Sequence, residues 1–203
     1  MTHKISKKDL VFRKDLDGIK FQIVWPEDIK IICEINWTDP YIYDAVLNGG
    51  VPENDEAYFY SIVAESKSEK DWYSYYIGMA FENQYISDRF NAPDHKTRRQ
   101  ELEKKHPNKD FMVCLGTPTF KYFKYSEKDQ PTKTKKGRFH EPLIKNIESL
   151  LIYTNHHDDL ENKRQFEFFK SNKQFFVKNI GFTEHLMRVE IGYGIFGDWR
   201  EDQ

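Results

Sequence analysis

The sequence predicts an α/β fold of the α+β type: a small, mainly antiparallel three-stranded sheet flanked by helices, with N- and C-terminal extensions. Three observations support this fold class. Residues 58–63 and 72–77 are aromatic and β-branched runs joined by a polar stretch, which is typical of a β-hairpin. Residues 110–116 form a compact apolar run that indicates another strand. Helical patterns before and after that run give the order strand, strand, helix, strand, helix.

The elements around the hairpin follow from local signals. Residues 21–25 indicate a strand, and Pro26 in a first turn predicts a short helix that continues to residue 35. Residues 87–106 are polar and rich in helix formers, and Pro93 marks a break within them.

The second half of the chain begins with a stretch of turn residues and lysines at 126–137, which predicts a mobile loop. Residues 140–153 predict a helix with one buried face. Residues 182–199 contain strand-like runs separated by glycines. The apolar side chains of the buried helical face are Leu143, Ile144, Ile147, Leu150 and Leu151.

These elements suggest three parts of the chain. Residues 1–55 form an N-terminal extension, with a role in specificity or dimerisation. Residues 56–170 form the core, which carries a basic insertion at 118–138. Residues 171–203 form a C-terminal strand extension that packs on the core.

The composition excludes several classes of protein. A chain of 203 residues is long enough for one well-buried core, and 16% aromatic residues are too many for a disordered chain. The mean hydropathy of -0.80 and the lack of a long apolar run argue against a membrane protein. No secretory signal is evident, and Cys33 and Cys114 lie in apolar segments, which predicts buried, reduced thiols. We therefore expect a cytoplasmic protein.

The net charge of -2 hides an uneven distribution. Residues 95–138 contain 13 basic and 5 acidic side chains, a net charge of +8, whereas the rest of the chain sums to -10. Such a block is either a solvated surface or a surface that follows a phosphate backbone. The basic side chains that we expect to bind nucleic acid are Lys96, Arg98, Arg99, Lys133, Lys135, Lys136 and Arg138.

A set of polar side chains in the middle of the chain occurs in a characteristic order. Residues 58–60 read Tyr-Phe-Tyr, and residues 76–78 read Tyr-Ile-Gly on the next expected strand. An arginine and a histidine follow, then a glutamate on the helix at 140–153 and an asparagine fourteen positions later. Together these features resemble the GIY-YIG endonuclease family over residues 56–165. The side chains that carry the resemblance are Tyr60, Tyr76, Arg89, His95, Glu148 and Asn162.

The resemblance implies a Mg²⁺-dependent (or Mn²⁺-dependent) DNA endonuclease that hydrolyses phosphodiester bonds through a single-metal site, with double-stranded DNA as the favoured substrate. Glu148 would be the metal ligand, and one carboxylate suffices because Mg²⁺ keeps most of its waters. Arg89 would bind the scissile phosphate as a planar donor. His95 would contact phosphate or shuttle a proton, and Asn162 would brace the site.

Some assignments stay open. Tyr60 and Tyr76 would share the orientation and deprotonation of the attacking water, and either one could take the proton. Asn155 is a rival to Asn162, because it lies seven residues after Glu148. Glu141, seven residues before Glu148, is a candidate second carboxylate.

The biological role also has alternatives. A compact chain without a separate DNA-binding module favours a restriction-like or stand-alone nuclease, and a homodimer is left open. A nucleic-acid-binding module that has lost cleavage is a second hypothesis. It is favoured by Tyr58 in place of the first motif's glycine and by Met79, Ala80 and Phe81 where many members carry a lysine. A protein-interaction domain is a third.

Overall fold

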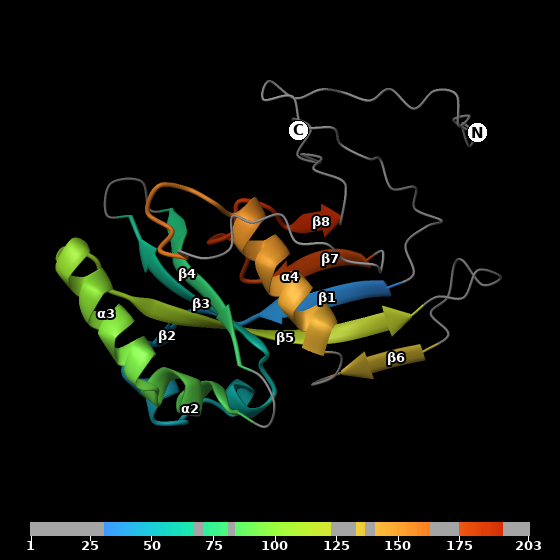
Figure 1. The fold of residues 1–203 in the computed structure, drawn as a ribbon, viewed down its shortest axis with the longest axis horizontal. Coiled ribbons are helices and arrows are strands. Elements are labelled where there is room, and N and C mark those ends of the chain that lie inside the picture. The colour runs from blue at the N-terminus through green and yellow to red at the C-terminus, as the bar shows by residue number, and fades with distance from the viewer. Residues whose placement is uncertain are drawn as a thin grey trace, which may run out of the picture.

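The computed structural model describes residues 31–66, 71–80, 84–122, 133–136, 141–162 and 175–192, with side chains left out at 133–136, 141–142 and 192. Its central feature is one curled sheet of eight strands, in the order β4-β3-β5-β1-β7-β8, with β2 and β6 also paired to β5 (Figure 1). The strands are β1 (Ile31–Trp37), β2 (Tyr41–Ile42), β3 (Phe59–Glu65), β4 (Trp72–Met79), β5 (Met112–Tyr122), β6 (Lys133–Lys136), β7 (Phe175–Gly181) and β8 (Glu190–Gly192).

Helices cover the sheet around its β4 end and its centre (Figure 1). Pro93 occupies the first position of α3, where its missing N–H costs no hydrogen bond, and it separates α3 from α2 as the sequence predicts. The helix predicted at 140–153 is also confirmed, with the expected apolar face buried. The helices are α1 (Tyr43–Leu47), a 3₁₀ turn η3 (Pro52–Asp55), α2 (Ile86–Asn91), α3 (Pro93–Lys105) and α4 (Glu141–Thr154).

The predicted sheet is wrong in size and in pairing. Instead of three mainly antiparallel strands, the described residues form an eight-stranded mixed sheet. The predicted hairpin is present as β3 and β4, and β3 also pairs antiparallel with β5. β1 then pairs antiparallel with β5 and parallel with β7, which extends the sheet well beyond the hairpin.

The helix predicted to continue to residue 35 is wrong over the described residues 31–35, which belong to β1. Alternate residues of β1 are buried, from Ile31 to Trp37, and this period of two is the signature of a strand. Pro26 suggested a helix start, but residues 21–30 lie outside the described part of the chain, as does the strand predicted at 21–25.

The strand predicted at 110–116 is longer than expected, because β5 continues through Pro118 to Tyr122. Pro118 falls between the part of β5 that pairs with β3, which ends at Gly116, and the part that pairs with β6, which begins at Thr119. A proline is tolerated there because no strand on that side needs its missing N–H. The loop predicted at 126–137 is wrong at 133–136, which form β6.

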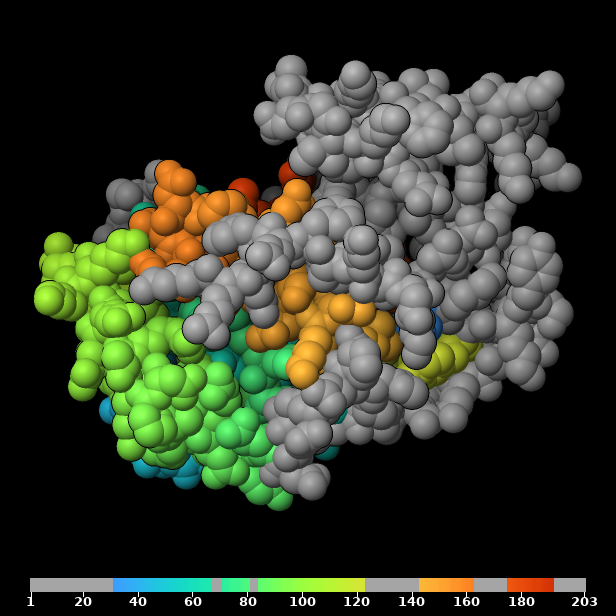
Figure 2. Space-filling model, viewed as in Figure 1, coloured from blue at the N-terminus to red at the C-terminus, as the bar shows by residue number. Residues whose placement is uncertain are grey.

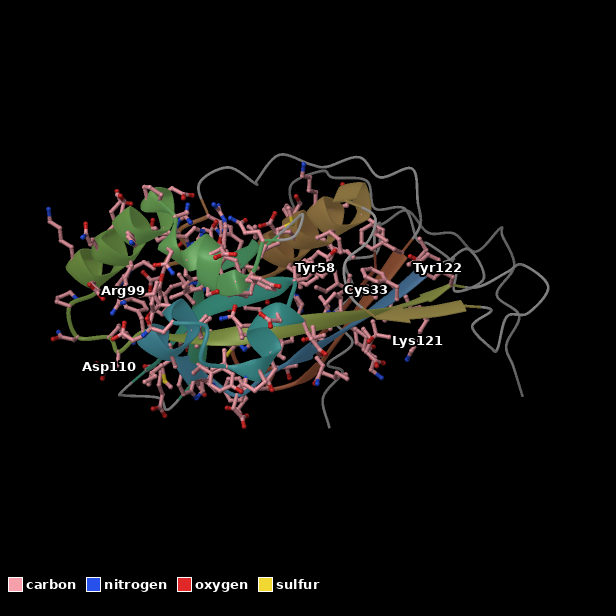
Figure 3. The ribbon with its side chains drawn as sticks, turned by 90° about the horizontal axis from the view of Figure 1, so that it is seen from below. Cys33, Tyr58, Arg99, Asp110, Lys121 and Tyr122 are labelled. Carbon is pink, nitrogen blue, oxygen red and sulfur yellow. The ribbon has the colours of Figure 1, made fainter. Side chains whose placement is uncertain are left out.

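Two core clusters lie on opposite sides of β3. Phe59 belongs to the cluster under α4, together with Cys33, whereas Tyr60 belongs to the cluster shared with α1, α2 and α3. Figure 3 shows Cys33 on the side of the sheet where α4 lies and Lys121 pointing to the other side. Cys33 and Cys114 are buried and free, as predicted.

No helix in the described part of the chain is long and apolar enough to cross a membrane.

Candidate functional site

A cavity of about 960 Å³ lies at the free edge of β4, where α3 and α4 approach from the two sides of that strand. Figure 2 shows the bordering elements on one face of the molecule, with α2 and α3 in green and α4 with the segment after it in orange. The cavity is lined by Tyr76, Met79, Gln84, Arg89, Asp94, Thr97, Arg98, Glu101, Leu102, Lys105, Glu148, Glu161 and Asn162.

Four of the six side chains singled out by the sequence line this cavity, and they come from four separate segments. Tyr76 lies on β4, Arg89 on α2, Glu148 on α4, and Asn162 on the segment that follows α4. Tyr60 and His95 do not line the cavity. They lie behind it, both fully buried, with the hydroxyl of Tyr60 2.8 Å from Nε2 of His95.

The two tyrosines share one face of the β3–β4 hairpin. Tyr60 pairs with Gly78, and Tyr76 lies two residues before that glycine, so the three residues point to the same side. The rings of Tyr60 and Tyr76 stack with their centroids 6.0 Å apart. A Cβ on Gly78 would overlap the Tyr60 hydroxyl and come within 2.8 Å of Cε1 of Tyr76. Glycine is therefore required where the Tyr-Ile-Gly run passes beneath Tyr60.

His95 is a buried member of α3, held among aromatic rings. It stacks on Phe90, with ring centroids 5.4 Å apart, and Nη1 of Arg98 lies 3.2 Å from its Nε2. Because a guanidinium only donates hydrogen bonds, Nε2 is an acceptor and the hydroxyl of Tyr60 donates to it. Burial, helped by Arg89 and Arg98, lowers the pKa of His95 to about 3, so the ring is neutral at physiological pH.

Both tyrosines are phenols in the isolated protein. Burial raises the pKa of Tyr60 well above its ordinary value, with Tyr76 and Glu148 acting in the same direction and Arg89 and Arg98 opposing them. The pKa of Tyr76 is also raised by burial, although Arg98 lowers it more than any other charge. Tyr76 differs from Tyr60 in being only partly buried and in facing the cavity.

The cations of the cavity are mostly paired with carboxylates. Nη2 of Arg89 lies 3.2 Å from Oδ2 of Asp94, and Lys105 forms an ion pair with Glu161. Sequence reasoning did not select Asp94, Lys105 or Glu161 as site residues. Nothing local distinguishes them, since their place in the cavity depends on how α3 and the segment after α4 lie against β4.

Asn162 binds the exposed edge of β4 through its side-chain amide. Its Oδ1 accepts a hydrogen bond from the Ile77 N–H at 3.0 Å, and its Nδ2 donates to the Ile77 carbonyl at 2.7 Å. The side chain thus takes the place of a neighbouring strand at the middle residue of the Tyr-Ile-Gly run.

Asn155, its rival in the sequence, has a different position. Its Oδ1 accepts hydrogen bonds from the backbone N–H groups of Met187 and Arg188, and it does not line the cavity. The side chain of Glu141 lies outside the described part of the structure.

Glu148 presents a partly buried carboxylate to the cavity from the rigid frame of α4. No cluster of three or more His, Cys, Asp or Glu side chains that could hold a metal occurs within the described ranges. Mg²⁺ can bind through one or two carboxylates and keeps waters for its other positions, so Glu148 is the residue that could hold it.

The side chains predicted to bind nucleic acid fall into different environments. Arg98 lines the cavity, and Lys96 is exposed on α3. Arg99, on another side of α3, pairs with Asp44 at 2.9 Å and with Glu103 at 2.8 Å. The strand β6 contains Lys133, Lys135 and Lys136, but its side chains are not described. Arg138 lies outside the described residues.

The comparisons with known proteins give no family for this chain. No family model, curated protein or solved structure matches it. Any assignment of function therefore depends on the geometry of the cavity and on the order of the motif residues.

Proposed function

We propose that this protein is a metal-dependent DNA endonuclease with a GIY-YIG-type site, restriction-like or stand-alone, that works in the cytoplasm. One observation carries the proposal: Tyr76, Arg89, Glu148 and Asn162, from four separate segments, line one cavity, with Tyr60 and His95 hydrogen-bonded behind it. The order of these residues along the sequence and their convergence on one cavity are two independent observations in support of the proposal.

The residues provide the functions that phosphodiester hydrolysis requires. Arg89 would donate to the non-bridging oxygens of the phosphate, exchanging its contact with Asp94 for one with substrate. Glu148 would hold a hydrated Mg²⁺ or Mn²⁺, which supplies positive charge to the phosphate and the leaving oxygen when bound. Water would attack phosphorus, forming a new P–O bond as the ester P–O bond breaks.

Tyr76 is better placed than Tyr60 to contact the attacking water, because only Tyr76 lines the cavity. Glu148 is among the charges that raise the pKa of Tyr76, so neutralisation of that carboxylate favours the phenolate that accepts the water proton. Tyr60 and the neutral His95 would hold the Tyr76 ring in place from behind.

Nicking of supercoiled plasmid tests the proposal directly. The wild type should nick DNA with Mg²⁺ or Mn²⁺ and not with EDTA. Glu148→Ala and Arg89→Ala should each reduce the rate by at least about a hundredfold, as expected for loss of a group that stabilises transition-state charge. Glu34→Gln, at an ion pair with Lys121, and Lys178→Ala, at an exposed position of β7, lie outside the cavity and should keep wild-type rates. Absence of nicking by the wild type with either metal would overturn the proposal.

A further inference from the structure

Arg98 projects from α3 into the cavity and is held there by two neutral groups. Its guanidinium carbon lies 4.0 Å from the centroid of the Tyr76 ring, the distance of a close cation–π contact. Its Nη1 lies 3.2 Å from Nε2 of His95. The contact with the ring and the contact with the imidazole hold the guanidinium from two directions at the cavity wall.

Arg98 forms no direct ion pair with a carboxylate of the described residues, which separates it from the other cavity cations, although it is near enough to Asp94 to help lower the pKa of that carboxyl. Arg89 pairs with Asp94, and Lys105 pairs with Glu161. Glu101 also lines the cavity, one turn further along α3, yet it forms no ion pair with Arg98. A guanidinium that is partly buried and in direct contact with no carboxylate favours the arrival of an anion.

The geometry leaves Arg98 with unused donors. One nitrogen, Nη1, contacts His95, and the ring of Tyr76 covers one face of the group. Within the described structure Nε and Nη2 donate no hydrogen bond. Two parallel N–H groups on one edge of a guanidinium match two oxygens of a phosphate.

We propose that Arg98 is a second phosphate-binding residue of this cavity, which, alongside Arg89, takes a non-bridging edge of a phosphodiester. This inference rests on the proposed function and deepens it. The sequence predicts Arg98 as part of a basic surface along the DNA backbone, whereas the proposal assigns it to the site that binds the phosphodiester.

Two probes test the proposal on the full-length chain. The first is inorganic phosphate, titrated while the arginine Nε–H signals are followed by ¹⁵N NMR. The Arg98 signal is identified by its absence in Arg98→Lys. It should shift saturably with phosphate, whereas the signal of Arg99, which is already paired with two carboxylates, should stay in place. An Arg98 signal that does not move would overturn the proposal.

The second probe is a fluorescently labelled DNA duplex, bound in EDTA across a salt series. Arg98→Met should weaken binding at least about tenfold and reduce the slope of log K against log salt by about 1. Arg98→Lys keeps the charge and should keep the slope, with a smaller loss of affinity because a lysine cannot bind two oxygens in one plane. Lys178→Met is the control for the loss of a cation, because Lys178 is exposed on β7 and lies outside the cavity; this variant should keep the wild-type affinity and salt slope.

The two probes separate this proposal from the proposed function. If phosphate shifts the Arg98 signal while the wild type binds and nicks no DNA, the anion site stands and the endonuclease assignment fails. If the wild type nicks DNA and Arg98→Met keeps its affinity and salt slope, the anion site fails and the endonuclease stands. A variant that loses kcat alone, with unchanged affinity, would likewise overturn phosphate binding and assign Arg98 to the ionisation of Tyr76.

Discussion

Gly78 lies directly beneath the Tyr60 ring, with so little space that a single added carbon would overlap the Tyr60 hydroxyl. The same carbon would come within 2.8 Å of Cε1 of Tyr76. This close packing explains why a glycine is needed at the end of the Tyr-Ile-Gly run: a larger side chain would displace both tyrosines of the candidate site. The glycine is needed for space, because its backbone has no positive φ.

Gly78→Ala should therefore damage the site more than the fold. We expect a loss of about 1–3 kcal/mol in the free energy of unfolding, typical of an overpacked interior, together with loss of most nicking activity as the tyrosines move apart. Urea unfolding and plasmid nicking measure the two effects. Gly50→Ala is the matched control, because a Cβ there meets only a backbone oxygen at 3.4 Å. Full activity in Gly78→Ala would show that the ring positions tolerate displacement.

Asn162 provides a second test, because its amide uses both a donor and an acceptor on Ile77. Asn162→Asp keeps the acceptor for the Ile77 N–H but places a carboxylate against the Ile77 carbonyl. We expect a loss of about 1–3 kcal/mol in stability, as for a buried acceptor left without a donor, and a reduced kcat because the edge that carries Tyr76 is no longer fixed.

Asn155→Asp is the corresponding control for that experiment. Asn155 is also buried. Its acceptor role toward Met187 and Arg188 survives the change, while the hydrogen bond from Nδ2 to the Leu151 carbonyl is lost. Stability should fall while kcat per folded molecule stays at the wild-type value. Equal losses of kcat in the two variants would contradict a special role for the Asn162 amide.

The parts of the fold that the sequence predicts are those fixed by local chemistry. The hairpin follows from two β-branched and aromatic runs, the break between α2 and α3 from Pro93, and the buried face of α4 from its apolar period. β1 was predicted as helix because Pro26 resembled a helix start, although residues 31–35 are strand. The sequence predicts strand in the extension at 171–203, where β7 lies, but not its parallel pairing with β1, because no local pattern connects residues such as Cys33 and Val177.

The candidate site also has residues that the sequence predicts and residues whose positions depend on packing. The order of the motif residues is visible in the sequence, so Tyr76, Arg89, Glu148 and Asn162 could be selected without coordinates. The position of Arg98 over Tyr76, and the burial of His95 behind the cavity, depend on where α3 lies against the hairpin. Such placement is a property of packing, which a single sequence does not display.

The ion pair between Lys105 and Glu161 suggests that cavity carboxylates restrain phosphate binding. Glu161→Gln should free Lys105 and remove a negative charge from the cavity lining, so the duplex affinity in EDTA should rise severalfold with a steeper salt dependence. The backbone hydrogen bond from Glu161 N–H to the Tyr75 carbonyl does not involve the side chain and should persist. Glu34→Gln removes the carboxylate paired with Lys121 outside the cavity and serves as the control. Weaker binding by Glu161→Gln would contradict a restraining role.

The buried imidazole of His185 leads us to expect that the folded protein loses stability in mild acid. The side chain is 3% exposed, lies edge-on to Trp37 with ring centroids 5.1 Å apart, and stacks on Phe182. Neither ring nitrogen has a hydrogen-bond partner among the described residues, and burial lowers the pKa of His185 to about 3. The folded protein therefore excludes a proton that the unfolded chain accepts near pH 6.5.

The sign of the effect follows from this difference. Between pH 6.5 and about 3 the unfolded state binds a proton at His185 that the folded state does not, so stability is complete above pH 6.5 and falls as the pH decreases through that window. From pH 7 to pH 5 the contribution of His185 is a loss of about 2 kcal/mol. His95, whose pKa is also lowered to about 3, acts in the same direction.

His185→Phe removes the titrating ring and keeps an aromatic side chain against Trp37 and Phe182. Urea unfolding at pH 7 and pH 5 should show a loss for the wild type that is larger than the loss for the variant by about 2 kcal/mol. His156→Asn, at an exposed position, controls for removal of a surface histidine and should retain the wild-type difference. An identical pH dependence in His185→Phe and the wild type would contradict this prediction, because it would mean that His185 binds a proton as readily in the folded protein as in the unfolded chain. The acid sensitivity would then come from His95 or other groups.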